Sequence, residues 1–175
     1  MSSIREELIK IATSTIQKSG IHKLTIRDLG NAVNIKSSSV MYHFKNKDGL
    51  MYELVKTYNE NFFIYLNEIN TQFSDPRKRL DKLVDLFEDV LKEDKLCLCG
   101  MLASESDNLD ALSKEQTKDF FVKLEQWIEE NLELINIDKS LSKVIVSSLE
   151  GAMLVDKLDN KNIRMEAIRL WLKSL

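Results

Sequence analysis

Turn-forming residues are scarce in this chain, which has one proline and five glycines among 175 residues. Glycine and proline are the strongest local signals for turns and loops, so their scarcity favours helices joined by short turns. Apolar residues also recur every three or four positions over most of the chain, which is the period of an amphipathic helix. The sequence therefore predicts an all-α fold of about nine helices.

A chain of this length can bury a sizeable core, and its hydrophobic fraction of 43% is ordinary for a globular protein. No stretch of the sequence reaches the roughly 18 consecutive apolar residues that a membrane helix needs. The first ten residues, MSSIREELIK, have the pattern of an amphipathic helix and lack the apolar run of a signal peptide. We therefore expect a cytoplasmic protein that has no membrane partner.

Residues 25–50 predict two short helices separated by a turn. Thr25 and Asp28 have the spacing of a capping box, so a helix should begin directly after Thr25. Asn34 can adopt the left-handed conformation that ends a helix. One of the serines in Ser37–Ser39 should cap the next helix.

The second short helix has an apolar face and a polar face. Val40 and Phe44 share a side and should pack against the preceding helix. The outward side or the helix ends then hold Lys36, Ser37, Ser38, Met41, Tyr42 and His43. A third, longer helix should begin at Asn46 or Lys47, where the helix dipole and the Lys47 ammonium together suit a phosphate. This is the pattern of a helix-turn-helix whose second helix enters a DNA groove.

The two parts of the chain differ in charge. Residues 1–50 hold eight basic and four acidic side chains, a net charge of +4, whereas the remainder has a net charge of −7 within the total of −3. A basic N-terminal part would attract phosphates, and an acidic remainder would be repelled by them. Chance alone can also produce a difference of a few charges, so this asymmetry supports DNA binding only together with the motif.

The first fifty residues resemble the DNA-binding domain of the TetR (tetracycline repressor) family. The resemblance is carried by an amphipathic helix that runs from Ile4 to Gly20, and by LTIRDL at 24–29 and YHFKNKDGL at 42–50. It implies a three-helix, helix-turn-helix DNA-binding head over residues 1–50. It also implies that residues 51–175 form a helical bundle for ligand binding and dimerisation.

The resemblance, together with the predicted outward side chains, gives two groups of DNA contacts. The residues expected on phosphates are Thr25, Tyr42, His43 and Lys47. The residues expected in the groove are Arg27, Lys36, Ser37, Ser38 and Ser39.

Four positions depart from the family's usual pattern. The family usually has Gly at Asn34, a small capping residue at Lys36 and Tyr at Met41, and it often has Ala at Gly30. Met41 cannot donate a hydrogen bond to a phosphate, although it could touch a thymine methyl group. A glycine inside a helix costs about 1 kcal/mol relative to alanine, so we expect Gly30 to destabilise its helix.

The chain after residue 50 contains further helix-start signals. They are Asp75 followed by Pro76, Ser113 with Gln116, Asp138 or Ser140, and Asn160. The helices near 114–135 and 139–158 are the predicted dimer helices, because Ser147, Ser148, Gly151 and Ala152 would allow close helix approach. From the residues alone, these small side chains could equally accommodate a tryptophan of the same chain. The resemblance favours a homodimer, which also suits a two-fold symmetric DNA site.

The resemblance further implies an apolar pocket for a small-molecule effector after residue 50. The candidate lining residues are Phe62, Tyr65, Phe87, Met101, Phe121, Trp127 and Met153. Large apolar side chains are more often ordinary core, so the sequence does not say which of them would face a ligand. Met and aromatic side chains would suit a hydrophobic or planar effector.

Other chemistry has little support in the sequence. We expect no cofactor and no enzymatic activity, because nucleophile and phosphate-loop motifs are absent. We expect no metal site, because a zinc site needs about four soft ligands. The chain offers Cys97 and Cys99, and its two histidines both lie in the head. Two cysteines separated by one residue bridge poorly, yet a thiol sensor stays open.

The sequence thus predicts a DNA-binding transcriptional regulator, most simply a repressor that a small-molecule effector releases from its operator. The alternative is a helical small-molecule or thiol-redox sensing module that does not act through DNA.

Overall fold

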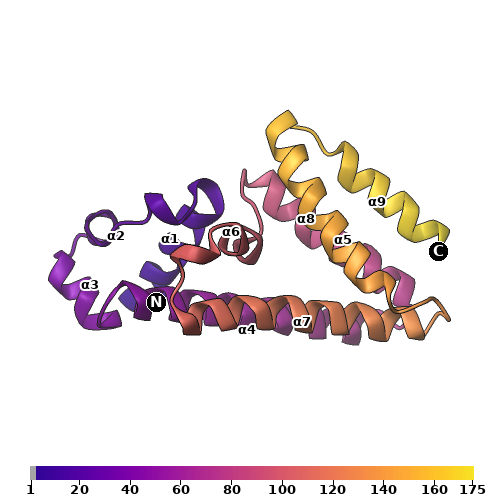
Figure 1. Cartoon of the computed structure of the whole chain (residues 1–175), viewed down its shortest axis with the longest axis horizontal. Coiled ribbons are helices and arrows are strands. Elements are labelled where there is room, and N and C mark those ends of the chain that lie inside the picture. The colour runs from indigo at the N-terminus through magenta and orange to yellow at the C-terminus, as the bar shows by residue number, and fades with distance from the viewer. Residues whose placement is uncertain (1–2) are drawn as a thin grey trace. The chain divides into compact units, whose positions relative to one another are not determined.

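The computed structural model describes residues 3–175, and its elements there are nine α-helices and two short 3₁₀ helices (Figure 1). The α-helices are α1 (Ile4–Ser19), α2 (Ile26–Ala32), α3 (Ser37–Phe44), α4 (Lys47–Gln72), α5 (Pro76–Lys92), α6 (Leu98–Ser104), α7 (Ala111–Glu133), α8 (Leu141–Asp159) and α9 (Ile163–Ser174). The 3₁₀ helices are η1 (Ile21–Lys23) and η2 (Ser106–Asn108). The predicted all-α fold is confirmed. Within residues 3–175, no helix is both long and apolar enough to cross a membrane.

The chain divides by its internal packing into two compact units. The first unit comprises Met1–Asn61 and Leu98–Lys118, and the second comprises Phe62–Cys97 and Asp119–Leu175. Helices α4 and α7 therefore contribute residues to both units. Because α4 continues without a break past residue 50, the predicted functional boundary there coincides with no helix end and stays a prediction.

In the first unit, local capping signals set the ends of α1. The Ser3 hydroxyl accepts the backbone N–H of Glu6, and the Glu6 carboxylate accepts the N–H of Ser3, which forms a complete capping box. The helix ends at Gly20, whose φ of 84° suits a residue without a side chain. The carboxylate of Glu105 then accepts the N–H of Ile21 at 3.0 Å, which ties the segment after α6 to the end of α1.

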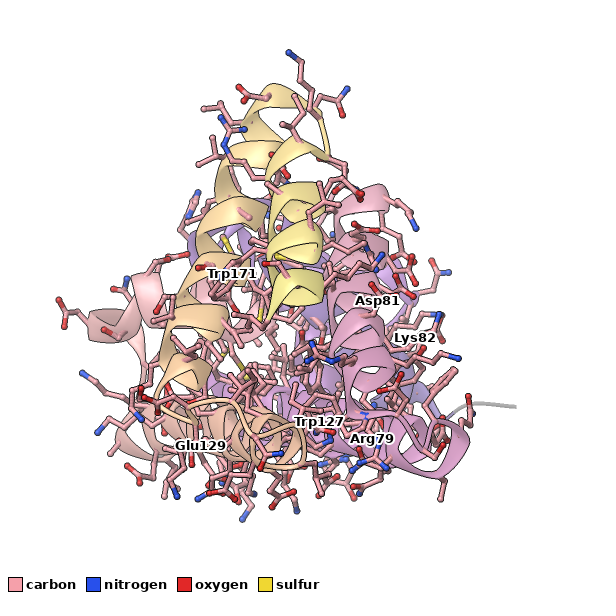
Figure 2. The ribbon with its side chains drawn as sticks, turned by 90° about the vertical axis from the view of Figure 1, so that its right-hand side faces the viewer. Arg79, Asp81, Lys82, Trp127, Glu129 and Trp171 are labelled. Carbon is pink, nitrogen blue, oxygen red and sulfur yellow. The ribbon has the colours of Figure 1, made fainter. Side chains whose placement is uncertain are left out.

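In the second unit, α5, α8 and α9 pack against one another (Figure 1). Helix α5 begins as predicted, with Asp75 as its cap and Pro76 at its first position. Arg169 on α9 forms ion pairs with three carboxylates of α5, namely Asp81, Asp85 and Glu88, at 2.6–3.0 Å. Figure 2 shows Asp81 on α5 beside the C-terminal helix that carries Trp171. This network fixes the position of α9 against α5.

Aromatic rings of α4 and α7 meet within the second unit. The Phe120 ring packs edge-on against Phe62 and Phe121, with centroids 4.9 and 5.3 Å apart, and a fourth ring, Phe63, lies 5.8 Å away. Edge-to-face pairs at these separations add to the stabilisation from apolar burial. Arg79 of α5 donates to the side-chain oxygen of Asn131 on α7, and the Asn131 amide donates in turn to the Trp127 carbonyl oxygen (Arg79 and Trp127 are labelled in Figure 2).

Two predicted helix starts are wrong. Ser113 does not cap α7, because the Asp110 carboxylate accepts the N–H groups of Leu112 and Ser113 and the helix begins at Ala111. Asn160 does not open α9, because it ends α8 in the left-handed conformation.

Candidate nucleic-acid interface

Helix α2 begins where the sequence predicts. Thr25 accepts the N–H of Asp28 through its hydroxyl oxygen and donates that hydroxyl to the Asp28 carboxylate. Leu29 on this helix is buried, and Asn34 has a φ of 58°, the predicted left-handed conformation. The turn between α2 and α3 is thereby set by local sequence.

Gly30 is required by packing within this motif. A Cβ atom at Gly30 would lie 2.7 Å from the carbonyl oxygen of Ile35, and the N–H of Ile35 donates to the Gly30 carbonyl oxygen at 2.9 Å. Any side chain would therefore push the turn away from α2. Helix propensity alone predicts a destabilising residue here, whereas this close approach of two backbone segments favours glycine.

Helix α3 is anchored by Val40 and Phe44, which are both buried. Its N-cap is Lys36, and no side chain caps the helix, so the predicted capping role of Ser37–Ser39 is wrong. These serines instead occupy the first turn of α3. Arg5 of α1 holds the end of the helix, because its guanidinium lies over the Phe44 ring and pairs with Glu53 of α4 at 2.8 Å.

Most of the predicted DNA contacts are exposed on the first unit. The exposed ones are Thr25, Arg27, Lys36, Ser37, Ser38, Tyr42 and Lys47, whereas Ser39 and His43 are half-buried. Tyr42 is 87% exposed, which is unusual for so large a ring, and it packs edge-on against the His43 ring. An exposed aromatic side chain surrounded by polar ones is typical of a surface that binds a partner.

Only Lys45 and Asn46 lie between α3 and α4, and the turn is centred on Lys45. Its φ is 67° and its ψ is −53°, and the N–H of Asn46 donates to the Phe44 carbonyl oxygen at 2.8 Å. This is a γ-turn of the rare, strained type. The Asn46 side chain then caps α4 by accepting the N–H of Gly49, where a Cβ atom would overlap the Phe44 carbonyl oxygen.

Comparison with known proteins identifies this head. The family model for bacterial regulatory proteins of the tetR family matches residues 8–54. The DNA-binding head therefore belongs to the TetR family. The chain is 31% identical over 83 residues to the HTH-type transcriptional repressor KstR2 of Rhodococcus jostii, a match that covers 47% of this chain. That match spans only 41% of the curated relative's own length.

Two solved structures extend the likeness to the whole chain. A TetR transcriptional regulator from Legionella pneumophila has a TM-score of 0.95 and 28% identity, with 99% of this chain and 97% of that one covered. A TetR-family regulator from Agrobacterium tumefaciens has a TM-score of 0.92 at 22% identity, covering 98% and 97%, which shows the shared fold. The TetR family consists of transcription regulators and not of enzymes.

The predicted effector residues of this chain fall in both units. Met101 lies in the first unit, and the other six lie in the second. Phe62 and Phe121 both contact the ring of Phe120, whereas Phe87, Trp127 and Met153 are buried. Tyr65 lines a shallow cleft of about 180 Å³ on the second unit, with Glu68, Ile69, Gln72, Phe73 and Lys82. A pocket role for the seven residues stays a prediction.

Both cysteines of the chain are buried. The Cys99 thiol donates to the side-chain oxygen of Asn59 at 3.6 Å, within the first unit. In the second unit, the backbone N–H of Cys97 donates to the Met153 sulfur at 3.0 Å. Sequence reasoning missed the partner of the Cys97 side chain, which is the carboxyl group of Glu150 on α8. Burial raises the pKa of Glu150 to about 7, although the hydrogen bond with Cys97 lowers it.

Proposed function

We propose that this protein is a transcriptional repressor that binds operator DNA as a homodimer and is released by a small-molecule effector. The observation that carries the proposal is the outward face of α3, where Lys36, Ser37, Ser38 and Tyr42 are exposed while Val40 and Phe44 anchor the helix. A rigid helix with a polar, unobstructed face fits the major groove of duplex DNA. Membership of a family of helix-turn-helix regulators supports the same function.

Phosphate contacts would come from the helix ends of the head. Lys47 is exposed at the first position of α4, where the helix dipole adds to its charge. Thr25 and Tyr42 are exposed and carry hydroxyl groups, and His43 is half-exposed beside Tyr42. These side chains would set the register of the head on DNA, and Arg27, Lys36 and Ser37–Ser39 would reach the groove.

The dimer surface would lie on α8 and α9. On α8, Val144, Leu154, Val155 and Leu158 are exposed, and they follow a helical stripe with Ser147 and Gly151. On α9, Ile163 and Leu170 are exposed on either side of Ala167. Exposed apolar stripes on adjacent helices fit a two-fold interface of helices with a second copy of the chain. The sequence predicts α7 and α8 as the dimer helices. We propose α9 in place of α7, because the second exposed apolar row belongs to α9.

An effector would act by differential affinity for two states of the dimer. It would bind more tightly to a state in which the two heads no longer match successive major grooves, about 34 Å apart. The ligand would thereby lower operator affinity without touching the DNA-binding surface.

The test begins by selecting duplexes that bind from a random pool. Affinity for the selected operator is then measured by fluorescence anisotropy over a range of salt concentrations. Binding should weaken steeply with salt, and Lys47→Ala should weaken binding to all sequences and reduce the salt slope by about one. Lys139→Ala, which changes an exposed lysine of the second unit, is the matched control. Recovery of no duplex at low salt would reject the function.

A further inference from the structure

The carboxyl group of Glu150 on α8 has one oxygen without a hydrogen-bond partner among the described residues. The Glu150 side chain is mostly buried, and its Oε1 atom has no accessible surface and no hydrogen-bond partner among the described residues. Its carboxyl group shares a hydrogen bond with the side chain of Cys97. A thiol is a weak donor, so this contact compensates little of the carboxyl group's lost hydration.

The surroundings of Glu150 on its own helix are apolar. Val146 and Leu149 precede it and Met153 follows it, and all three are buried. Cys97, which faces it from the segment before α6, is buried as well. Such surroundings disfavour the charged form of the acid, which explains the raised pKa given above. A titratable group perturbed by burial and held by a specific neighbour is a candidate for function.

Asp156, six residues later on α8, provides the contrast. Its carboxylate is also buried, yet it accepts the backbone N–H groups of Arg164 and Met165 and pairs with the Arg164 guanidinium at 3.0 Å. All these partners belong to the second unit. The burial of the Asp156 carboxylate is therefore explained by its role as a helix cap. No contact of comparable strength compensates the burial of the Glu150 carboxyl group.

We propose that Glu150 is the polar recognition group of the effector site, and that the effector is a largely apolar molecule carrying a protonated amine or a comparable N–H cation. The inference rests on the proposed effector response. A cation would supply a charge-assisted donor to the oxygen that lacks one. A neutral alcohol would supply a weaker donor, and a carboxylate would be repelled. The apolar side chains around Glu150 would contact the remainder of the ligand.

The test uses three probes of matched shape, namely 2-phenylethylamine, 2-phenylethanol and 3-phenylpropionate. Their dissociation constants are measured by calorimetry at pH 8 on the full chain. The amine should bind about tenfold or more tightly than the alcohol, since hydrogen bonds to charged groups are the stronger ones. The carboxylate should bind most weakly. In Glu150→Gln the dissociation constants of the amine and the alcohol should agree within about twofold.

Glu130→Gln, which changes an exposed acid on α7, is the matched control and should retain the preference for the amine. A direct readout is the ¹³C resonance of the Glu150 carboxyl group, whose titration should move to lower pH when the amine is present. Equal binding of the three probes, no binding of any up to millimolar concentration, or an amine preference that persists in Glu150→Gln would overturn the proposal. Operator binding is measured separately, so loss of the proposed function would appear as failure to bind DNA, whatever the probe result.

Discussion

Asp156 near the end of α8 holds the start of α9 through Arg164. The carboxylate accepts the Arg164 backbone N–H at 3.0 Å and pairs with the guanidinium of the same residue at 3.0 Å. One buried side chain therefore caps a helix that begins several residues later and also neutralises a charge in its first turn. The two helices with the exposed apolar rows are joined by this contact.

Asp156→Ala should lower the free energy of unfolding by about 2–4 kcal/mol, because it removes the acceptor of two backbone donors and one charged donor. Urea unfolding followed by circular dichroism measures the change. Asp159→Asn alters another partner of the same guanidinium, but that side chain is 40% exposed. Its cost should stay within about 1 kcal/mol. Equal effects of the two substitutions would contradict the capping role.

The free energy of unfolding should fall as the pH rises from about 4.5 to about 7, the range between the ordinary and the folded-state pKa of Glu150. Its pKa is about 7 in the folded chain against 4.5 ordinarily, so the unfolded chain releases this proton at lower pH. Stability is unaffected by this group below about pH 4.5, declines between about 4.5 and 7, and is lower by about 3 kcal/mol above that range. Unfolding of the wild type and Glu150→Gln at pH 5 and pH 8 tests this, since the substitution should remove the decline. The same change in stability between pH 5 and pH 8 in both proteins would contradict this prediction.

Gly30→Ala should destabilise the first unit by about 1–3 kcal/mol, because the new Cβ atom would press on the Ile35 carbonyl oxygen. Thermal unfolding measures the loss, and operator affinity should fall with it as α3 shifts. Asn31→Ala, at an exposed neighbouring position, should change stability by no more than about 0.5 kcal/mol. A stabilising Gly30→Ala would mean that helix propensity outweighs packing here.

Leu158→Glu should convert the dimer to monomer, because Leu158 is 84% exposed in the single chain and belongs to the apolar row of α8. Sedimentation equilibrium measures the dissociation constant of the dimer. Val122→Glu places the same charge on α7, where Val122 is 50% exposed, and should leave the dimer intact. If Val122→Glu gave a monomer and Leu158→Glu left the dimer intact, the interface would lie on α7.

Lys36→Ala should abolish the preference for one base pair of the operator, at a cost of about 1–3 kcal/mol for the preferred base. Among Lys36 and the residues of α3, only Lys36 and His43 carry side-chain nitrogen donors, and His43 is half-buried. Repeating the selection from random duplexes with the variant measures the preference. Lys45→Ala, at another exposed lysine, should leave the selected sequence unchanged. A uniform loss over all sequences would make Lys36 a phosphate contact.

Sequence reasoning worked best where a structural signal is local. The cap at Thr25, the left-handed Asn34 and the proline start of α5 each depend on neighbouring residues, and the structure has them as predicted. The prediction at Ser113 failed because a stronger acceptor, the Asp110 carboxylate, lies three residues earlier. A charged acceptor generally binds orphan backbone donors better than a hydroxyl group does.

The features that sequence reasoning missed depend on contacts between distant segments. The need for glycine at position 30 comes from the chain folding back on itself at Ile35, which helix propensity does not describe. The start of α9 depends on Asp156 of the preceding helix. Glu150 resembles any surface acid in the sequence, and only its burial beside Cys97 distinguishes it.

The γ-turn at Lys45 has a mechanical consequence for the head. Because only Lys45 and Asn46 connect α3 to α4, and Lys45 has a strained conformation, the connection is too short and too constrained to absorb a rotation of α4. Phe44 and Asn46 on the two sides of Lys45 are joined by a backbone hydrogen bond, so a small turn of α4 about its axis must carry the outward side chains of α3 with it. Replacing this two-residue connection with a longer, flexible one would let α3 keep its position while α4 moves.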